Sequence, residues 1–218
     1  MKIATWNIER LSKSTTKTPL IIGWLERMDA DILILTETTT SIELKGDYHF
    51  FCTSRYGENY FRDDERRVAI YSKYPMIEQL KTFRGDTSLC IIVQTPLGDL
   101  SVYGTIVGVR GNRQNDFIED LDQQILDYQT IAQKGALCIA GDLNMSFEDN
   151  YYFTNEGRHK MINVFKRLQL INLTEAIPQN IDHIVISQFF IGNRNISIST
   201  WNTDKTLSDH IGVCVEIT

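Results

Sequence analysis

Two short runs of the sequence are apolar on both faces of the strand that each would form. DILILT spans residues 31–36, and ALCIA spans residues 136–140. A strand with apolar side chains on both faces has to be covered on both sides, as it is in layered α/β proteins. The chain must therefore contain sheet structure that other elements cover.

The remaining patterns predict more strands than helices. PLGD at residues 96–99 is typical of a turn, so the strands on either side of it form a hairpin rather than a crossover. This hairpin breaks the regular alternation that a doubly wound parallel sheet requires. We expect strands at residues 2–7, 48–53, 68–72, 77–83, 89–95, 100–105, 181–187, 196–201 and 212–217, and helices at residues 19–28, 115–133 and 158–168. The pattern predicts a four-layer α/β sandwich of two packed mixed or antiparallel sheets flanked by helices.

Composition limits the class of protein further. The chain has 218 residues, 42% of them hydrophobic, which is enough for one domain over residues 1–218 with a single core. It has no apolar run of roughly 18 residues, so we expect no membrane span. The formal net charge of −6 argues against a general basic surface that coats nucleic acid, although a local basic cleft remains possible.

The four cysteines show no metal-binding spacing. None forms a CxxC or CxxH pair of the kind that structural zinc uses. Three of them lie in apolar runs, as expected of buried, reduced thiols. With no secretory signal at the start of the sequence, we expect a cytoplasmic protein.

Polar side chains stand at the ends of several apolar strands, or inside them. Asn7 and Glu37 close two strands, Asp182 lies within an apolar run, and Asp209 and His210 precede the last strand. Each could be explained alone, as a turn former, a cap or a solvated side chain. Together they are harder to explain separately, because each unpaired buried polar group costs about 1 to 3 kcal/mol.

CIAGDLNM repeats this pattern, with Asp142 and Asn144 directly after an apolar strand. Asp142 could simply cap a turn. If these acids and amides instead meet at one point, the carboxylates would repel one another without a cation. Oxygen ligands of this kind suit Mg²⁺, with Mn²⁺ as a possible substitute, rather than zinc.

Six short motifs together resemble those of the endonuclease/exonuclease/phosphatase superfamily. In chain order they are WN at 6–7, TE at 36–37, VAIYSKYP at 68–75, GDLN at 141–144, IDHI at 181–184 and SDH at 208–210. Each motif alone is weak, but six in the family's order run from the first strand to the last. The resemblance implies a deoxyribonuclease-I-like fold and Mg²⁺-dependent hydrolysis of phosphate esters by in-line attack of water.

The resemblance also implies roles for the metal and water. Glu37 would be the main Mg²⁺ ligand, with Asn7 beside it and Asp209 on the metal or just outside it. Asp142 would orient or deprotonate the attacking water. Because an ordinary aspartate has a pKa of about 3.9, Asp142 would be a poor base unless the site raised that value.

Phosphate binding falls to other residues. By the same resemblance, Asn144 would contact a phosphate oxygen, and His210 would bind the phosphate while Asp182 orients its ring. Arg110 and Arg113 lie on a glycine-containing loop that we expect to face the site, where either could contact a phosphate.

The leaving-group side departs from the family's pattern. The family usually has His or Tyr at the end of the strand that holds Tyr103, and we place Thr105 at that position. A threonine hydroxyl is no general acid near neutral pH, and losing such an acid typically costs roughly 10² to 10⁴ in rate. Water on the metal could protonate the leaving group, Tyr103 could substitute, or the substrate could have a good leaving group.

Other charged residues receive structural interpretations. Arg62, Arg66 and Arg67 are mixed with three acids in RDDERR and predict a solvated charged face. His183 alternates away from Asp182 and is expected to be structural.

We therefore expect a Mg²⁺-dependent phosphoesterase, a nuclease acting on DNA or RNA. One alternative is a phosphatase or phosphodiesterase for a small or lipid-derived phosphate. A second is a binding protein with a weakened catalytic site, which the missing leaving-group acid would favour.

Overall fold

The computed structural model describes residues 1–11, 15–57, 61–108, 110–114 and 116–218. Its strands and helices are, in chain order, β1 Lys2–Asn7, α1 Thr18–Met28, β2 Ile32–Thr39, β3 His49–Cys52, β4 Glu65–Ser72, β5 Met76–Leu80, β6 Ser88–Thr95, β7 Gly98–Ile106, α2 Phe117–Ala132, β8 Ala136–Asp142, α3 Asn155–Arg167, β9 Leu170–Asn172, β10 Asp182–Ser187, α4 Gln188–Ile191, β11 Ile196–Trp201 and β12 Gly212–Ile217.

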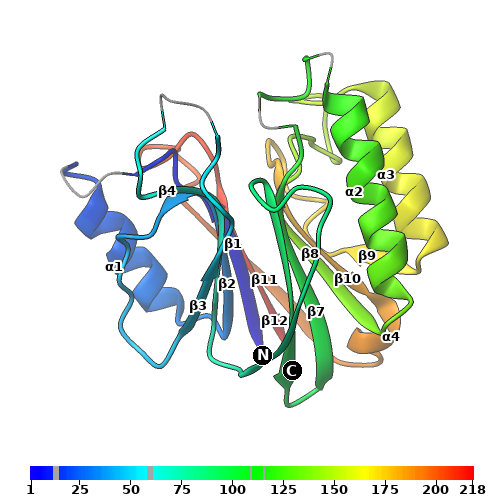
Figure 1. The fold of residues 1–218 in the computed structure, drawn as a ribbon, viewed down its shortest axis with the longest axis horizontal. Helices are drawn as coiled ribbons and strands as arrows, with labels where there is room; N and C mark the ends of the chain where they lie inside the picture. Colours follow the sequence, from blue (N-terminus) through cyan, green and yellow to red (C-terminus); the bar gives the residue numbers. More distant parts are fainter. Residues whose placement is uncertain (12–14, 58–60, 109, 115) are drawn as a thin grey trace.

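The strands form two six-stranded mixed sheets that pack face to face. The order is β11-β12-β1-β2-β4-β3 in the first sheet and β5-β6-β7-β8-β10-β9 in the second. Strands β1 and β2 are parallel, as are β7 and β8, and the other pairs are antiparallel. Figure 1 shows α1 outside the first sheet and α2 and α3 outside the second. The predicted four-layer α/β sandwich is confirmed.

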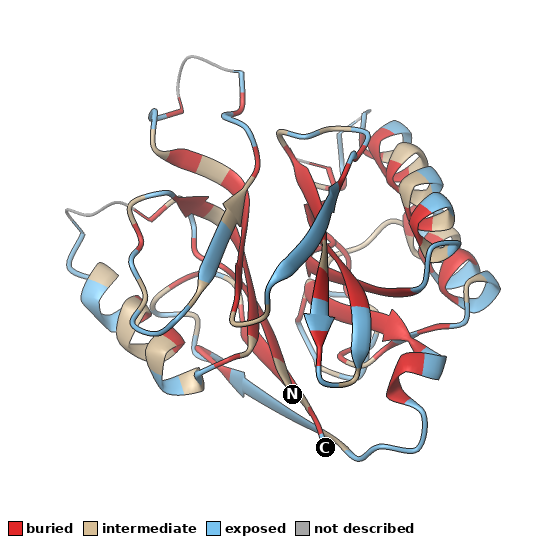
Figure 2. Cartoon of the chain, turned by 60° about the horizontal axis from the view of Figure 1, so that its bottom comes forward, coloured by how far each residue is buried: buried red, intermediate tan, exposed pale blue. Residues whose placement is uncertain are grey.

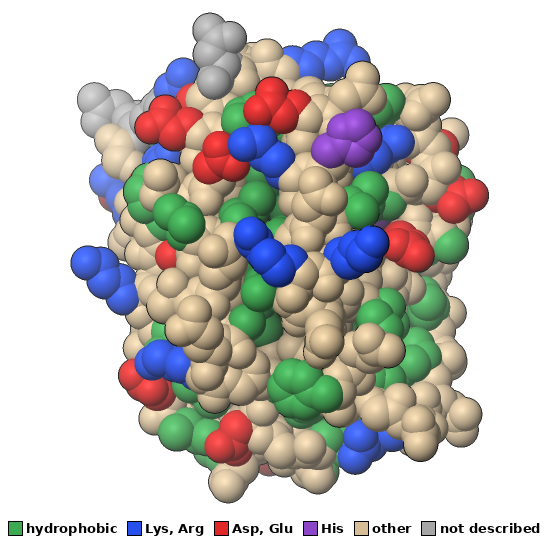
Figure 3. Space-filling view, turned by 90° about the vertical axis from the view of Figure 1, so that its right-hand side faces the viewer, with side chains coloured by type: hydrophobic (Ala, Val, Ile, Leu, Met, Phe, Trp, Pro, Cys, Tyr) green, Lys and Arg blue, Asp and Glu red, His purple; other side chains and the backbone are tan. Residues whose placement is uncertain are grey.

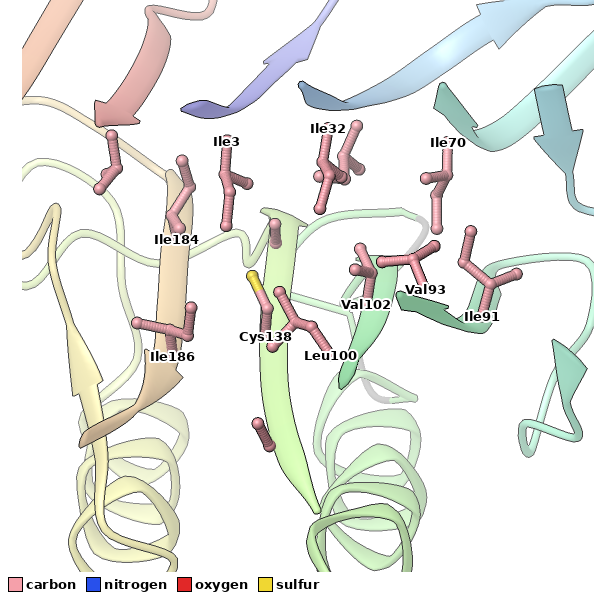
Figure 4. Packing of buried hydrophobic residues seen from close by; sticks show 14 of the residues in the cluster. Ile3, Ile32, Ile70, Ile91, Val93, Leu100, Val102, Cys138, Ile184 and Ile186 are labelled. Atoms are coloured by element: carbon pink, nitrogen blue, oxygen red, sulfur yellow. The ribbon is translucent and has the colours of Figure 1, made fainter. Parts of the chain in front are cut away.

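The core between the two sheets explains the strands that are apolar on both faces. Ile3 and Ile32 of the first sheet point toward Val102, Cys138 and Ile184 of the second, as Figure 4 shows. The opposite faces of the same strands pack against helices, α1 on the first sheet and α2 and α3 on the second. Figure 2 shows these strands buried and the outer faces of the helices exposed.

Most predicted elements are present, with a few differences. The strand predicted at residues 68–72 begins earlier, at Glu65, so part of the polar RDDERR run lies in β4. The three-residue β9 and the four-residue α4 were not predicted, because so short a segment carries little periodicity. Within the described ranges, every helix is too short or too polar to cross a membrane.

Candidate active site

Strands from both sheets bring polar side chains to one end of the sandwich. The parallel strands β1 and β2 carry Asn7 and Glu37, and β8 ends at Asp142. Asp182 begins β10 and lies opposite Asp142 in the antiparallel register. His210 lies just before β12, the neighbour of β1. Polar residues from distant parts of the sequence therefore meet, as their positions at strand ends predict.

A cleft of about 470 Å³ opens at this end of the sandwich. Asp182 is fully buried behind the cleft, next to His210. All the expected metal-binding and phosphate-binding residues except Arg113 line the cleft. The residues that line it are Asn7, Glu9, Glu37, Ile106, Arg110, Gly111, Asp142, Asn144, Asp209 and His210.

Unusual backbone conformations accompany the site. Glu37 and Asn144 have positive φ angles of 46° and 51°. Such conformations cost a non-glycine residue about 1–3 kcal/mol and cluster at functional sites, where the surrounding structure holds them. Gly141 has a φ of 136°, and a Cβ there would lie 2.1 Å from the carbonyl oxygen of Thr105. Only glycine lets β8 pass this close to β7 before Asp142.

Asp142 is held by hydrogen bonds to both carboxylate oxygens. The Nδ2 of Asn7 donates to Oδ2 at 3.2 Å, and the backbone N–H of Asn144 donates to Oδ1 at 2.8 Å. Burial raises the pKa of Asp142 to about 7, the His210 cation opposes this rise, and the nearby Asp182 carboxylate adds to it. The carboxylate therefore has a fixed orientation at the cleft.

The ring of His210 is held by Asp182. Its Nδ1 lies 2.5 Å from Oδ2 of Asp182. Ser208 fixes the loop, because its hydroxyl accepts from the backbone N–H of His210 at 3.1 Å and donates to the carbonyl oxygen of Asn7 at 2.7 Å. Burial lowers the pKa of His210, but the carboxylates of Asp182 and Asp142 outweigh it and raise the pKa to about 10.

His183 is structural, as expected from its position in the alternating strand. It is fully buried, and its Nε2 donates to the carbonyl oxygen of Met145 at 2.9 Å. Its Nδ1 lies 3.0 Å from the Thr174 hydroxyl and 3.3 Å from the amide nitrogen of Asn172. The imidazole therefore anchors the segment that follows Asn144.

The side-chain amide of Asn144 is bonded to the backbone that follows β7. Its Nδ2 donates to the carbonyl oxygens of Val107 at 3.0 Å and Gly108 at 3.2 Å. The amide nitrogen is thus engaged by backbone, although Asn144 lines the cleft. Its side chain instead ties the end of β8 to the segment after β7.

Successive side chains of β7 point to opposite faces of the sheet, which determines which of them can reach the cleft. Tyr103 and Thr105 point away from the cleft toward α2, where their hydroxyls donate to Asp127 Oδ2 and Gln124 Oε1, each at 2.7 Å. Ile106 is the residue of β7 that lines the cleft. Neither Thr105 nor Tyr103 is therefore among the residues that line the cleft. The side chain that β7 presents to the cleft is a hydrocarbon, which has no proton to donate.

RDDERR is not a uniformly solvated face, contrary to our expectation. Arg62 is substantially exposed and Arg66 half-buried, but the side chains of Glu65 and Arg67 are only 4% and 7% exposed. The guanidinium of Arg67 forms an ion pair with Oε1 of Glu37 at 3.1 Å. This cation therefore belongs to the surroundings of the candidate site.

The two loop arginines lie differently. Arg110 is exposed and lines the cleft, which leaves its expected role in phosphate contact open to test. Arg113 is also exposed but lies over the ring of Tyr152, 5.9 Å from its centroid, and is not among the residues that line the cleft.

The side chains of the cleft fit a hard divalent cation. Four carboxylates line it, against the cationic side chains of Arg110 and His210; they belong to Glu9, Glu37, Asp142 and Asp209. Burial and hydrogen bonding to Asp209 raise the pKa of Glu9, as expected where carboxylates crowd together. Within the described ranges no three carboxylate, imidazole or thiol groups already enclose an ion position. Mg²⁺ does not require three, because it commonly takes one or two carboxylates and keeps several waters.

Four residues of the site were missed by sequence reasoning. Glu9 and Ser208 each stand within two residues of a named candidate, and that proximity was the available signal. Ile106 and Arg67 gave no signal, because strand alternation and an ion pair between neighbouring strands place them at the site.

Comparisons with known proteins agree with the fold. The model of the Endonuclease/Exonuclease/phosphatase family matches residues 4–210. A search of curated proteins finds no match.

Solved structures with similar folds include nucleases and a phosphatase. An AP endonuclease from Archaeoglobus fulgidus aligns with a TM-score of 0.72 at 14% identity, covering 100% of this chain and 99% of the other. The 3′ phosphatase NExo from Neisseria, bound to a product DNA hairpin, gives 0.70 at 16%, with the same coverage. The AP endonuclease LMAP from Leishmania major gives 0.69 at 16%, covering 98% and 86%. At these identities the likeness shows the fold.

Proposed function

The chain belongs to the Endonuclease/Exonuclease/phosphatase family, and from this premise we propose that it is a metal-dependent hydrolase of phosphodiester bonds in DNA or RNA. The observation that carries the proposal is the presence of two oriented pairs at one cleft. Asn7 holds Asp142, and Asp182 holds His210. We propose that the Asn7–Asp142 pair orients the attacking water and that the Asp182–His210 pair binds the phosphate.

Asp142 is suited to orient the attacking water. Its oxygens accept hydrogen bonds from Asn7 and from the backbone of Asn144, so the carboxylate cannot rotate freely. A water that donates to this carboxylate would be held for in-line attack on phosphorus, and the carboxylate could take its proton as the P–O bond forms.

His210 is suited to bind the phosphate. Asp182 accepts from Nδ1, which leaves Nε2 as the donor for a ligand in the cleft. A protonated imidazole there would stabilise the negative charge that develops on the phosphoryl oxygens. Arg110 on the opposite loop would add a second positive charge, and we propose the same phosphate-contact role for it.

Mg²⁺, or Mn²⁺ in its place, would polarise the phosphoryl group and neutralise charge when bound. Glu37 and Asn7 would hold it, with Asp209 as a further oxygen ligand at an exposed position. The oxygen-only character of these donors supports magnesium over zinc. We also propose that residues 1–218 act as one catalytic domain in the cytoplasm.

Ile106 supports a second candidate function. Ile106 is the side chain of β7 at the cleft and is no general acid. An ester whose leaving group departs without protonation would therefore be hydrolysed more readily than an ester with a poor leaving group. This favours a phosphatase or phosphodiesterase acting on a small or lipid-derived phosphate. Figure 3 shows basic and acidic side chains interspersed over the face that includes α2 and α3, which gives nucleic acid no strong attraction to that side.

A panel of substrates tests these proposals. Purified protein is incubated with plasmid, single-stranded DNA, RNA and a chromogenic phosphodiester, with Mg²⁺ or with EDTA, beside an Asp142→Asn variant. We expect Mg²⁺-dependent cleavage of nucleic acid that the variant loses. Activity on the chromogenic ester alone would favour the second function. No metal-dependent activity on any substrate would refute both and leave the binding protein with a weakened site.

A further inference from the structure

Arg67 is a buried cation enclosed by aromatic rings. Its side chain is 7% exposed, and its guanidinium carbon lies 4.3 Å from the ring centroid of Phe61 and 5.1 Å from that of Tyr56. Its Nε is buried and has no hydrogen-bond partner among the described residues. A charge in such surroundings has lost most of its hydration and depends on a counter-charge.

That counter-charge is Glu37. The Nη1 of Arg67 donates to Oε1 of Glu37 at 3.1 Å, and within the part of the chain that the structure describes no other carboxylate pairs with Arg67. Glu65, two residues earlier on β4, is occupied by Arg10 and Arg62 at 2.9 and 2.6 Å. The pairing of Arg67 with Glu37 is therefore specific, and the buried charge of Arg67 depends on it.

We propose that Arg67 is a resident counter-ion that competes with the divalent cation for Glu37 and weakens its binding. The inference rests on the proposed function, in which Glu37 is the main metal ligand. Glu37 pairs with a guanidinium, so a metal gains less from this carboxylate than from a free one. The buried guanidinium also stays close to the metal and repels it.

The expected effect is large enough to measure. A charge within about 4–6 Å changes the affinity of a carboxylate for a proton by about 10- to 1,000-fold. A divalent cation carries twice the charge of a proton but keeps several waters, so we take the lower end of this range. Neutralising Arg67 should tighten Mg²⁺ binding by at least about tenfold.

Calorimetric titration of MgCl₂ into protein stripped with EDTA measures this affinity at pH 7.5 and fixed ionic strength. Arg67→Met keeps the apolar contacts with the aromatic rings and removes the charge, and its Kd should fall at least about tenfold. Arg67→Lys keeps the charge and should remain within about threefold of the wild type. If Arg67→Met does not fold, Arg67→Gln is also neutral and is subject to the same prediction.

The matched control is Arg66→Met, which removes an equal charge from the adjacent position. Arg66 donates to the carbonyl oxygens of Asp63 and Glu65 and not to Glu37, so its Kd should not change. Adding Glu37→Gln to Arg67→Met should abolish the tighter binding. A purely structural role for Arg67 predicts the opposite sign, since damage to the site would weaken binding.

Three results would overturn the inference. Equal or weaker Mg²⁺ binding by a folded Arg67→Met protein would refute the role of Arg67 while leaving the proposed function intact. If the double variant with Glu37→Gln still binds Mg²⁺ more tightly than the wild type, the cation does not bind at Glu37. If neither wild type nor Arg67→Met binds Mg²⁺, both the inference and the proposed metal dependence fail.

Discussion

The buried imidazole of His183 should make the protein lose stability under mildly acidic conditions. Burial lowers the pKa of His183 to about 4, against an ordinary value of 6.5. The imidazole is neutral in the folded protein, because Nδ1 faces the hydroxyl of Thr174 and the amide of Asn172 while Nε2 donates to Met145. An added proton at Nδ1 would face groups that already donate.

The sign follows from comparing the two states. Above pH 6.5 the imidazole is neutral in both, and its contribution to folding is fully present. As the pH falls from 6.5 towards 4, His183 takes up a proton in the unfolded chain but stays neutral in the folded protein, which favours unfolding. At 1.36 kcal/mol per pKa unit, the loss is about 1.4 kcal/mol at pH 5.5 and about 2.6 kcal/mol at pH 4.5.

Denaturant unfolding of the wild type and of His183→Gln between pH 7.5 and 4.5 measures this loss. Glutamine cannot titrate, and its amide can donate to Met145. His183→Gln should be less stable at pH 7.5, and the difference should shrink by about 2.6 kcal/mol at pH 4.5. All other titrating groups are the same in the two proteins, so their contributions cancel when one free energy of unfolding is subtracted from the other. A difference that stays constant over this range would refute the assignment of a neutral imidazole.

Three further substitutions test the geometry of the site. Gly141→Ala should destabilise the protein by more than about 3 kcal/mol in denaturant unfolding, because the new Cβ would clash with the carbonyl oxygen of Thr105; a folded variant of normal stability would contradict the backbone described. Tyr103→Phe should leave turnover unchanged while costing about 1–2 kcal/mol of stability through loss of the hydrogen bond to Asp127; a large fall in turnover would restore Tyr103 as an acid. Ile106→His should raise turnover of esters with poor leaving groups by about 10², and an unchanged rate ratio between poor and good leaving groups would show that β7 does not serve the leaving group.

Much of the fold could be predicted because burial leaves a direct mark on composition. DILILT and ALCIA are apolar on both faces, and they form central strands between helices and a second sheet. Polar side chains at the ends of such strands can be seen one at a time in the sequence. That Asp142 and Asp182 converge followed from the strand pattern and the family's motifs together.

The errors have a common physical origin in the direction of side chains. VYGTI in β7 is apolar or small on both faces, so its composition does not reveal that Ile106, and not Thr105, faces the cleft. The burial of Arg67 depends on Glu37, which lies 30 residues earlier and on the neighbouring strand. The residue pattern of one segment does not show which residue of another segment forms an ion pair with it.

The pairing of β1 with β12 has a consequence for when the site can first act. Asn7 and His210 are separated by most of the sequence, and β1 lies between β2 and β12 in its sheet. During synthesis the first strand leaves the ribosome long before the last one, so that edge of β1 stays open until β12 arrives. Contacts of such long sequence separation form slowly. A ribosome-bound nascent chain that still lacks β12 should therefore have no hydrolytic activity.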